Sequence, residues 1–217
     1  MTKREIPLLQ YDNETKKKIH EETTRLIAIK GFSAVSMRDI AKEVGIKMSS
    51  LYYYYESKED LLNEIFDVFE RRYRHYFDWL SSINAKSCSL EEVMDNMFNK
   101  EFLEALDPLG CFGMALVLKE QHSYEGARKC VFELFFDHSI TCMQADLDKL
   151  VANGVIPASD TKMIARLLMI SVMASNDLCL HEYMAEKPPF SRLEFLNNLK
   201  SFLTTMLKQG VLPSTSS

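Results

Sequence analysis

The sequence has few of the residues that interrupt helices, with seven Gly and six Pro in 217 residues. They leave long uninterrupted stretches between Gly31, Gly45, Pro108, Gly126 and Gly154. Because helices commonly end at Gly or before Pro, this spacing is typical of a mainly helical protein. The sequence also lacks the alternation of apolar and polar residues that marks a half-buried strand. The predicted fold class is therefore all-α.

Features of exported and membrane proteins are lacking as well. The five cysteines are an odd number without a CxxC motif, which argues against a disulfide framework. The segment Met1–Asp12 has no apolar core of a secretory signal. The most apolar run, Leu167–Ala174, is shorter than the roughly 20 residues that a membrane span needs. We expect a cytoplasmic protein with reduced thiols and no membrane partner.

A strong excess of one charge is missing too. The chain has 26 Lys and Arg against 31 Asp and Glu, a net charge of −5 at pH 7. Residues 1–60 carry eleven basic and ten acidic residues, and the remainder carries fifteen and twenty-one. The basic end is thus the N-terminal one, but only weakly. This balance excludes a protein that coats nucleic acid over its whole surface, and charge alone does not assign DNA binding.

Two short helices with clear end signals are expected after a first helix of about 13–28. The first helix should stop at Gly31. Ser36 can cap the second helix, with Asp39 placed three residues later to complete a capping box. Gly45 should end this second helix after little more than two turns. A third short helix is expected over Met48–Tyr54.

A long fourth helix should begin after Ser57, which can cap it. Its apolar residues recur at helical spacing and comprise Leu61, Leu62, Ile65, Phe66, Phe69, Tyr73, Tyr76, Phe77 and Leu80. The helix is too long to belong to the N-terminal unit alone. Further helices are expected at about 90–106, 109–121, 124–152, 160–185 and 191–209, which gives about nine in total.

The segment after Ser36 has the arrangement of a helix-turn-helix, with two short helices joined by the turn Val44–Lys47. In the following helix, Leu51 and Tyr55 are four residues apart and should both face inward. The remaining serine and tyrosine hydroxyls then point outward, where they can donate to phosphate oxygens. A helical protein-interaction module that uses these tyrosines without DNA is the alternative.

These elements together resemble the DNA-binding domain of the TetR (tetracycline-repressor-like) family. The residues that carry the resemblance are Gly31-Phe32, Ser36-Met37-Arg38-Asp39-Ile40-Ala41, Gly45, and Leu51-Tyr52-Tyr53-Tyr54-Tyr55-Glu56-Ser57-Lys58-Glu59-Asp60-Leu61. The match covers about residues 13–65 without a gap, and the rest of the chain matches only in helix number and length. The resemblance implies an N-terminal arm (1–12), a helix-turn-helix domain (13–60), a ligand-binding and dimerisation domain (61–212) and a frayed tail (213–217).

The resemblance also implies roles at a double-stranded DNA operator. Arg38 should reach a base or phosphate at the groove edge, and Lys47–Ser49 should read bases. Tyr53 should reach a thymine methyl or a sugar. The expected phosphate contacts are Ser50, Tyr52, Tyr54 and Lys58. Two residues depart from the family pattern. Lys47 replaces a small capping residue, a loss of about 1 kcal/mol, and Met48 can contact a thymine methyl but not guanine in bidentate fashion.

A homodimer is expected because two recognition helices are needed for two half-sites of a (pseudo)palindromic operator. The resemblance places the interface on the last two large helices, with a monomeric core as the alternative. The expected interface residues are Met169, Val172, Met173, Asn176, Leu180, Phe195, Leu199, Phe202, Leu203 and Met206.

A cavity for a small, largely apolar effector is implied among the middle helices, which are rich in Phe and Met. The candidate lining residues are Phe66, Phe69, Tyr73, Phe98, Phe102, Phe112, Met114, Leu118, His122, Phe135, His138, Met143 and Met173. The same stripes are compatible with an ordinary core. Effector binding should tilt the fourth helix and release DNA, and repression is the expected outcome.

No cofactor, metal or catalytic residue is expected. His138 and Cys142 lie four residues apart, but no third metal ligand is near them in the sequence. The sequence has no nucleophile elbow, no phosphate-binding glycine loop and no paired His and Glu at metal spacing. We therefore do not expect an enzyme.

Overall fold

The computed structural model describes residues 13–99, 112–185 and 192–210. Within these ranges the chain is helical without a strand, which confirms the all-α prediction. The elements are α1 (Glu14–Lys30), the 3₁₀ turn η1 (Phe32–Ala34), α2 (Met37–Val44), α3 (Met48–Tyr54), α4 (Lys58–Asn84), α5 (Leu90–Met97), α7 (Phe112–Glu120), α8 (Glu125–Lys129), the π-helical η2 (Cys130–Ser139), α9 (Ile140–Ala152), α10 (Thr161–Met184) and α11 (Arg192–Gln209). The expected arm, the expected tail, Phe102 and Cys111 lie outside the described residues.

The short N-terminal helices begin and end where the sequence predicts. The Asn13 side chain accepts a hydrogen bond from the backbone N–H of Thr15 at 2.7 Å and so caps α1. Ser36 and Asp39 form the predicted capping box at the start of α2. Gly45 ends α2 in the left-handed conformation at φ +78°, which a residue with a Cβ rarely adopts. These signals fix the turn between α2 and α3.

A polar pair lies in the core of α1–α3. His20 on α1 and Tyr55 after α3 are both buried, and His20 Nε2 lies 2.8 Å from the Tyr55 hydroxyl oxygen. Burial lowers the pKa of His20 to about 4, so the imidazole is neutral at physiological pH. The pair attaches the end of α3 to α1 and therefore helps to set the angle at which α3 leaves the unit.

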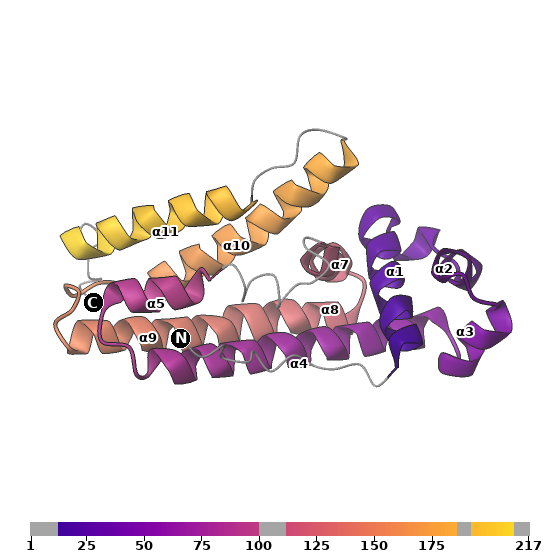
Figure 1. Ribbon diagram of the computed structural model, residues 1–217, viewed down its shortest axis with the longest axis horizontal. Helices are drawn as coiled ribbons and strands as arrows, with labels where there is room; N and C mark the ends of the chain where they lie inside the picture. The colour runs from indigo at the N-terminus through magenta and orange to yellow at the C-terminus, as the bar shows by residue number, and fades with distance from the viewer. Residues whose placement is uncertain (1–12, 100–111, 186–191, 211–217) are drawn as a thin grey trace.

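Helix α4 joins the N-terminal unit to the rest of the molecule (Figure 1). It runs from the α1–α3 end toward α5, with α8 and α9 alongside it. An ion pair between Lys16 Nζ and Glu64 Oε1, at 2.8 Å, ties α1 to its first turns. Helix α7 packs across α1 from the other side. The N-terminal unit is thus held by two helices of the larger domain.

One local feature of the larger domain differs from expectation. The sequence predicts an uninterrupted α-helix over 124–152, but the middle of this segment, Cys130–Ser139, is π-helical. The Ser139 hydroxyl donates to the carbonyl of Leu134 five residues earlier, at 2.8 Å. Widened turns of this kind are uncommon and are frequent at functional sites. The segment faces α4.

Helix α10 has two apolar faces. One face packs inside the chain through Ile164, Leu168 and Met169, while Leu167 and Ile170 on the opposite face are exposed. Its length of 24 residues and its composition would allow it to cross a membrane, whereas the most apolar run within it, Leu167–Ala174, is shorter. Of its most apolar window, 44% is buried inside the chain, and core helices of soluble proteins pass the same test. The membrane interpretation therefore has weak support.

Candidate DNA-binding surface and effector cavity

Helix α3 lies at one end of the molecule (Figure 1), with its two faces divided as predicted. Leu51 and Tyr55 are buried and anchor the helix to α1 and α2. Tyr52 is 51% exposed and Tyr53 is 83% exposed. Large aromatic side chains are seldom left this exposed without a binding role, because burial of their rings is favourable. The structure thus presents tyrosines on an outer surface.

The other predicted DNA contacts are distributed around α3. Arg38, Lys47, Ser49 and Ser50 are exposed. Met48 and Tyr54 are half-buried, and the Tyr54 hydroxyl accepts a hydrogen bond from the Asn13 side-chain amide at 3.3 Å. Lys47 makes no side-chain capping hydrogen bond, as predicted from its departure from the family pattern. The part of these residues in DNA binding stays a prediction.

Lys58, the last of the predicted phosphate contacts, already has hydrogen-bond partners within the chain. Its ammonium group donates to the backbone carbonyls of Phe32 at 2.7 Å and of Val35 at 2.6 Å. It also lies 3.9 Å from the centre of the Phe32 ring, within the range of a cation–π interaction. The ammonium thus holds the turn between α1 and α2. A phosphate contact would require it to leave these partners.

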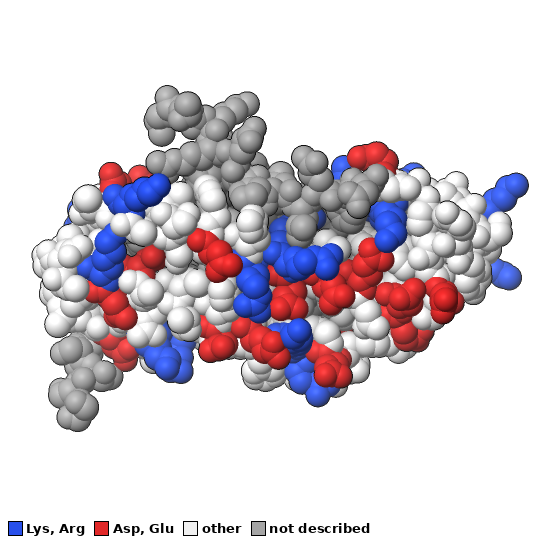
Figure 2. Space-filling model, turned by 90° about the horizontal axis from the view of Figure 1, so that it is seen from below, with Lys and Arg blue, Asp and Glu red and all other residues white. Residues whose placement is uncertain are grey.

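Charged groups are unevenly spread over the surface. Figure 2 shows Lys and Arg side chains projecting from a largely uncharged surface at the α2–α3 end, and mixed charges along the middle of the molecule. Exposed basic residues of this end are Arg38, Lys42 and Lys47. The tip of the molecule therefore combines hydroxyls and a few positive charges, the groups that contact phosphates.

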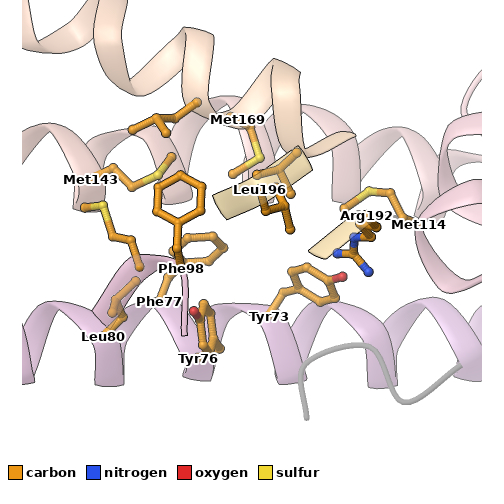
Figure 3. Close-up of a pocket in the computed structure, with 13 residues that line it drawn as sticks. Tyr73, Tyr76, Phe77, Leu80, Phe98, Met114, Met143, Met169, Arg192 and Leu196 are labelled. Atoms are coloured by element: carbon orange, nitrogen blue, oxygen red, sulfur yellow. The ribbon is translucent and has the colours of Figure 1, made fainter. Parts of the chain in front are cut away.

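A mainly apolar cavity of about 60 Å³ lies in the larger domain (Figure 3). Its walls come from α4, α5, α7, α9, α10 and α11. Phe98, which directly follows α5, also lines it. The lining residues are Tyr73, Tyr76, Phe77, Leu80, Met97, Phe98, Met114, Met143, Leu168, Met169, Val172, Arg192 and Leu196. Since one water needs roughly 10–15 Å³ by a comparable measure, the cavity is small, and a larger ligand requires the helices to move apart.

Four of the predicted lining residues meet at this cavity: Tyr73, Phe98, Met114 and Met143. Others lie elsewhere, namely Phe66, Phe69, Phe112, Leu118, His122, Phe135, His138 and Met173. Periodicity placed these residues on the right helices but does not say which part of a buried face borders a void. His122, for example, is exposed.

Sequence reasoning missed the polar groups of the cavity. The Tyr76 hydroxyl and the Arg192 Nε are buried and have no hydrogen-bond partner among the described residues. Burial raises the pKa of Tyr76 above its usual value, so the hydroxyl keeps its proton. In Figure 3, Arg192 and the Tyr73 hydroxyl lie at one end of the cavity. A buried donor without a partner is unfavourable, and a ligand with an acceptor would satisfy it.

The predicted dimer residues differ in how far they are buried within the chain itself. Met169, Met173, Asn176, Leu180 and Leu203 are buried within the chain itself. Val172, Phe195, Leu199 and Met206 are half-buried, and Phe202 is exposed. The opposite face of α10 presents the exposed apolar residues Met163, Leu167, Ile170 and Leu178. Sequence reasoning cannot tell which of two apolar faces is inside, because both have the same composition.

Helix α7 connects the cavity to the N-terminal unit. Its Met114 lines the cavity, and two residues at its other end contact α1 and the turn that follows it. Lys119 Nζ donates to the carbonyls of Ala28 and Ile29, both at 3.1 Å. The buried Glu120 accepts from the backbone N–H of Phe32 at 3.0 Å. These contacts could not be predicted from local sequence patterns, because about 90 residues separate the partners.

Comparison with known proteins assigns the N-terminal unit. Residues 19–65 match the family model described as bacterial regulatory proteins, tetR family. Over 88 residues the chain is 35% identical to the biofilm operon icaADBC HTH-type negative transcriptional regulator IcaR of Staphylococcus aureus, covering 38% of this chain and 44% of that protein. The corresponding regulator of Staphylococcus epidermidis is 29% identical over 83 residues, or 38% of this chain and 43% of that one. The chain spans less than half the length of these relatives.

Solved structures resemble the whole described chain. The ketosteroid transcriptional regulator KstR2 of Mycobacterium tuberculosis has a TM-score of 0.69 at 16% identity, covering 92% of this chain and 97% of that one. A protein of Saccharomonospora viridis in complex with choline has a TM-score of 0.62 at 21% identity, covering 88% and 95%. At these identities the likeness concerns the fold.

The fold and the exposed third helix define a helix-turn-helix protein with a second, larger helical domain. Residues 19–65 match the tetR family of bacterial regulatory proteins, and the relatives that match the N-terminal part of the chain are HTH-type transcriptional regulators. The resemblance inferred from the residues around Gly45 and the tyrosine-bearing helix is thereby confirmed.

Proposed function

We propose that this chain is a cytoplasmic, ligand-responsive transcriptional repressor that binds a (pseudo)palindromic operator as a homodimer. The observation that carries the proposal is the division of α3 between a buried anchor, Leu51 and Tyr55, and the exposed Tyr52 and Tyr53. Because α3 lies at one end of the molecule, it can enter a major groove without obstruction from the larger domain. The negative regulator IcaR, related through the N-terminal unit, supports repression over activation.

A second copy of the chain is the proposed partner of the exposed face of α10. The residues of this face, Met163, Leu167, Ile170 and Leu178, recur at helical spacing and form one apolar stripe. Such a stripe on a 24-residue helix gains stability when it is covered. A twofold axis through the stripe would give each dimer two copies of α3 for two half-sites about one DNA turn apart.

The proposed effector is a small, largely apolar compound with at least one hydrogen-bond acceptor. The apolar walls of the cavity favour a hydrophobic body, while the Tyr76 hydroxyl and the Arg192 Nε offer donors that lack a partner. Because the cavity of about 60 Å³ is small, entry of the effector must separate its walls. Helices α4 and α7 would then move relative to each other.

This movement is the proposed route to DNA release. Helix α4 carries Lys58, which holds the α1–α2 turn. Helix α7 carries Lys119, which holds the end of α1, and Glu120, which holds the same turn as Lys58. Both helices also line the cavity. A shift between them would change the spacing of the two recognition helices in a dimer. A coupling free energy of about 1–3 kcal/mol is sufficient for release by several-fold to about a hundredfold.

An electrophoretic mobility shift with the DNA upstream of the chain's own gene tests the proposal. We expect retardation of this fragment, weaker at higher salt, and much less retardation of a shuffled fragment of equal composition. A protein-interaction module would retard neither fragment. Equal, salt-insensitive behaviour on both fragments would contradict operator recognition.

A further inference from the structure

Three potential metal ligands meet on the side of the larger domain, away from the α3 surface. They are Asp78 on α4, His138 in η2 and Cys142 on α9. His138 Nε2 lies 3.0 Å from Asp78 Oδ1 and 3.9 Å from Cys142 Sγ. The three ligand atoms all lie within 4.8 Å of one another. His138 and Cys142 are close in the sequence, whereas Asp78 lies sixty residues before His138 and is brought to them only by the fold.

We propose that Asp78, His138 and Cys142 form a binding site for a thiophilic divalent cation, with Zn²⁺ as the best match. Zn²⁺ binds thiolate, imidazole and carboxylate in tetrahedral geometry, and three protein ligands leave a fourth position for water. The thiolate disfavours Mg²⁺ and Ca²⁺, which select oxygen ligands. On binding, the thiol proton of Cys142 passes to solvent.

The distances suit this coordination with small movements. Zn–N bonds of about 2.1 Å and Zn–S bonds of about 2.3 Å place tetrahedral ligand atoms roughly 3.4–3.7 Å apart. The observed separations of 3.0 Å and 3.9 Å lie on either side of that range. The Asp78 side chain is 58% exposed and can rotate, whereas His138 is 21% exposed and is held more firmly. The carboxylate therefore makes most of the adjustment.

The surrounding charges are compatible with a cation. Arg74, one helical turn before Asp78, is paired with Glu70 at 3.0 Å, and Lys129 also lies 3.6 Å from Glu70. Arg74, the positive group that acts on Cys142, thus has an acidic partner of its own. A surface ion pair between Asp78 and His138 would need no thiol, so Cys142 is the residue that distinguishes a metal site from such a pair.

The location of the site suggests a regulatory effect, a part of the inference that rests on the proposed function. A bound cation would join α4 to the η2–α9 segment, about 30 Å along α4 from Lys58. Phe77, Leu80 and Met143, neighbours of the ligands in sequence, line the cavity. The cation would therefore fix one cavity wall from outside and limit the movement of α4 proposed for DNA release.

Titration of the full chain with Co²⁺ after treatment with a chelator tests the site. We expect one Co²⁺ per chain, with the absorption bands of tetrahedral cobalt and of a cobalt–thiolate bond, and displacement by Zn²⁺. Cys142→Ser should abolish the thiolate band, and His138→Gln and Asp78→Asn should weaken binding at least about tenfold. Cys88→Ser and His181→Gln, which remove an exposed thiol and another His–Asp pair, should leave binding unchanged.

Absence of the thiolate band in the wild type, or its persistence in a folded Cys142→Ser variant, would overturn the site. Circular dichroism verifies that each variant keeps its helices. Operator affinity with and without Zn²⁺ tests the regulatory part. We expect a change of several-fold in the wild type and none in Cys142→Ser. If Zn²⁺ binds but leaves operator affinity unchanged, the regulatory part is wrong while the site stands, and if no DNA is bound at all, the proposed function fails independently.

Discussion

The buried carboxylate of Glu120, at the end of α7, accepts a hydrogen bond from the backbone N–H of Phe32 at 3.0 Å. This bond joins the larger domain to the turn between α1 and α2. Lys58 on α4 bonds the same turn. The orientation of the DNA-binding unit is therefore fixed by two helices that both reach the cavity.

Replacement of Glu120 should show the strength of this connection. Glu120→Ala leaves the Phe32 N–H buried without an acceptor, and we expect it to lower the free energy of unfolding by about 1–3 kcal/mol. Glu120→Gln keeps an acceptor oxygen and should lose less than Glu120→Ala. Urea denaturation measures both. Equal losses for the two variants would mean that the hydrogen bond does not account for the effect.

Replacement of tyrosine by phenylalanine should change the free energy of unfolding in opposite directions at Tyr76 and at Tyr55. Tyr76→Phe removes a buried donor without a partner, so the free energy of unfolding should stay equal or rise by about 1 kcal/mol. Tyr55→Phe removes the hydroxyl that bonds His20 at 2.8 Å and should lower it by about 1–2 kcal/mol. A clear loss for Tyr76→Phe in thermal unfolding would indicate a partner for that hydroxyl.

Acid should destabilise the chain through His20. Its pKa is about 4 when folded and 6.5 when unfolded, so between these pH values the unfolded chain binds more protons. The contribution of His20 to the free energy of unfolding therefore falls as the pH is lowered from about 6.5 to about 4, by up to about 3 kcal/mol.

The His20 contribution needs a comparison with His20→Gln, because Asp146, with a pKa raised to about 6 by burial, acts in the opposite direction. Between pH 7 and pH 4.5 the wild type should lose more stability than His20→Gln. Parallel pH dependence of the two proteins would show that His20 titrates normally.

A charge on the exposed face of α10 should separate the proposed dimer. Ile170 is 51% exposed, and Ile170→Glu would bury a carboxylate between two copies at an unfavourable free energy. Light scattering should give about twice the chain mass of 25.1 kDa for the wild type and the single mass for Ile170→Glu.

A matched control for the dimer is Phe132→Glu on η2, where the replaced side chain is 59% exposed and lies off the proposed interface. This variant should remain dimeric. A monomeric wild type at micromolar concentration would rule out the interface.

The N-terminal unit could be predicted closely because its signals are local. The Ser36–Asp39 capping box, the left-handed Gly45 and the limits of α3 depend on residues within a few positions of one another. The inward placement of Leu51 and Tyr55 follows from their spacing alone. Local rules therefore sufficed for the surface that we propose to contact DNA.

The larger domain could be predicted only in outline, because its interactions are between distant residues. Periodicity identified its helices, but not that Glu120 would contact Phe32 or that Asp78 would join His138. Lys58, which the sequence predicts to contact a phosphate, donates instead to two backbone carbonyls more than twenty residues earlier in the chain. Tertiary contacts such as these decide which of several equivalent apolar or charged residues has a functional partner.

The central claim is that the exposed face of α3 contacts DNA, and Tyr53→Glu tests it most directly. Tyr53 is 83% exposed, so the substitution should leave the fold intact while it places a negative charge against phosphates. Fluorescence anisotropy with the upstream DNA fragment should show an affinity at least about tenfold weaker than wild type, with Phe132→Glu unchanged. Wild-type affinity in a folded Tyr53→Glu protein would contradict the placement of α3 in the groove.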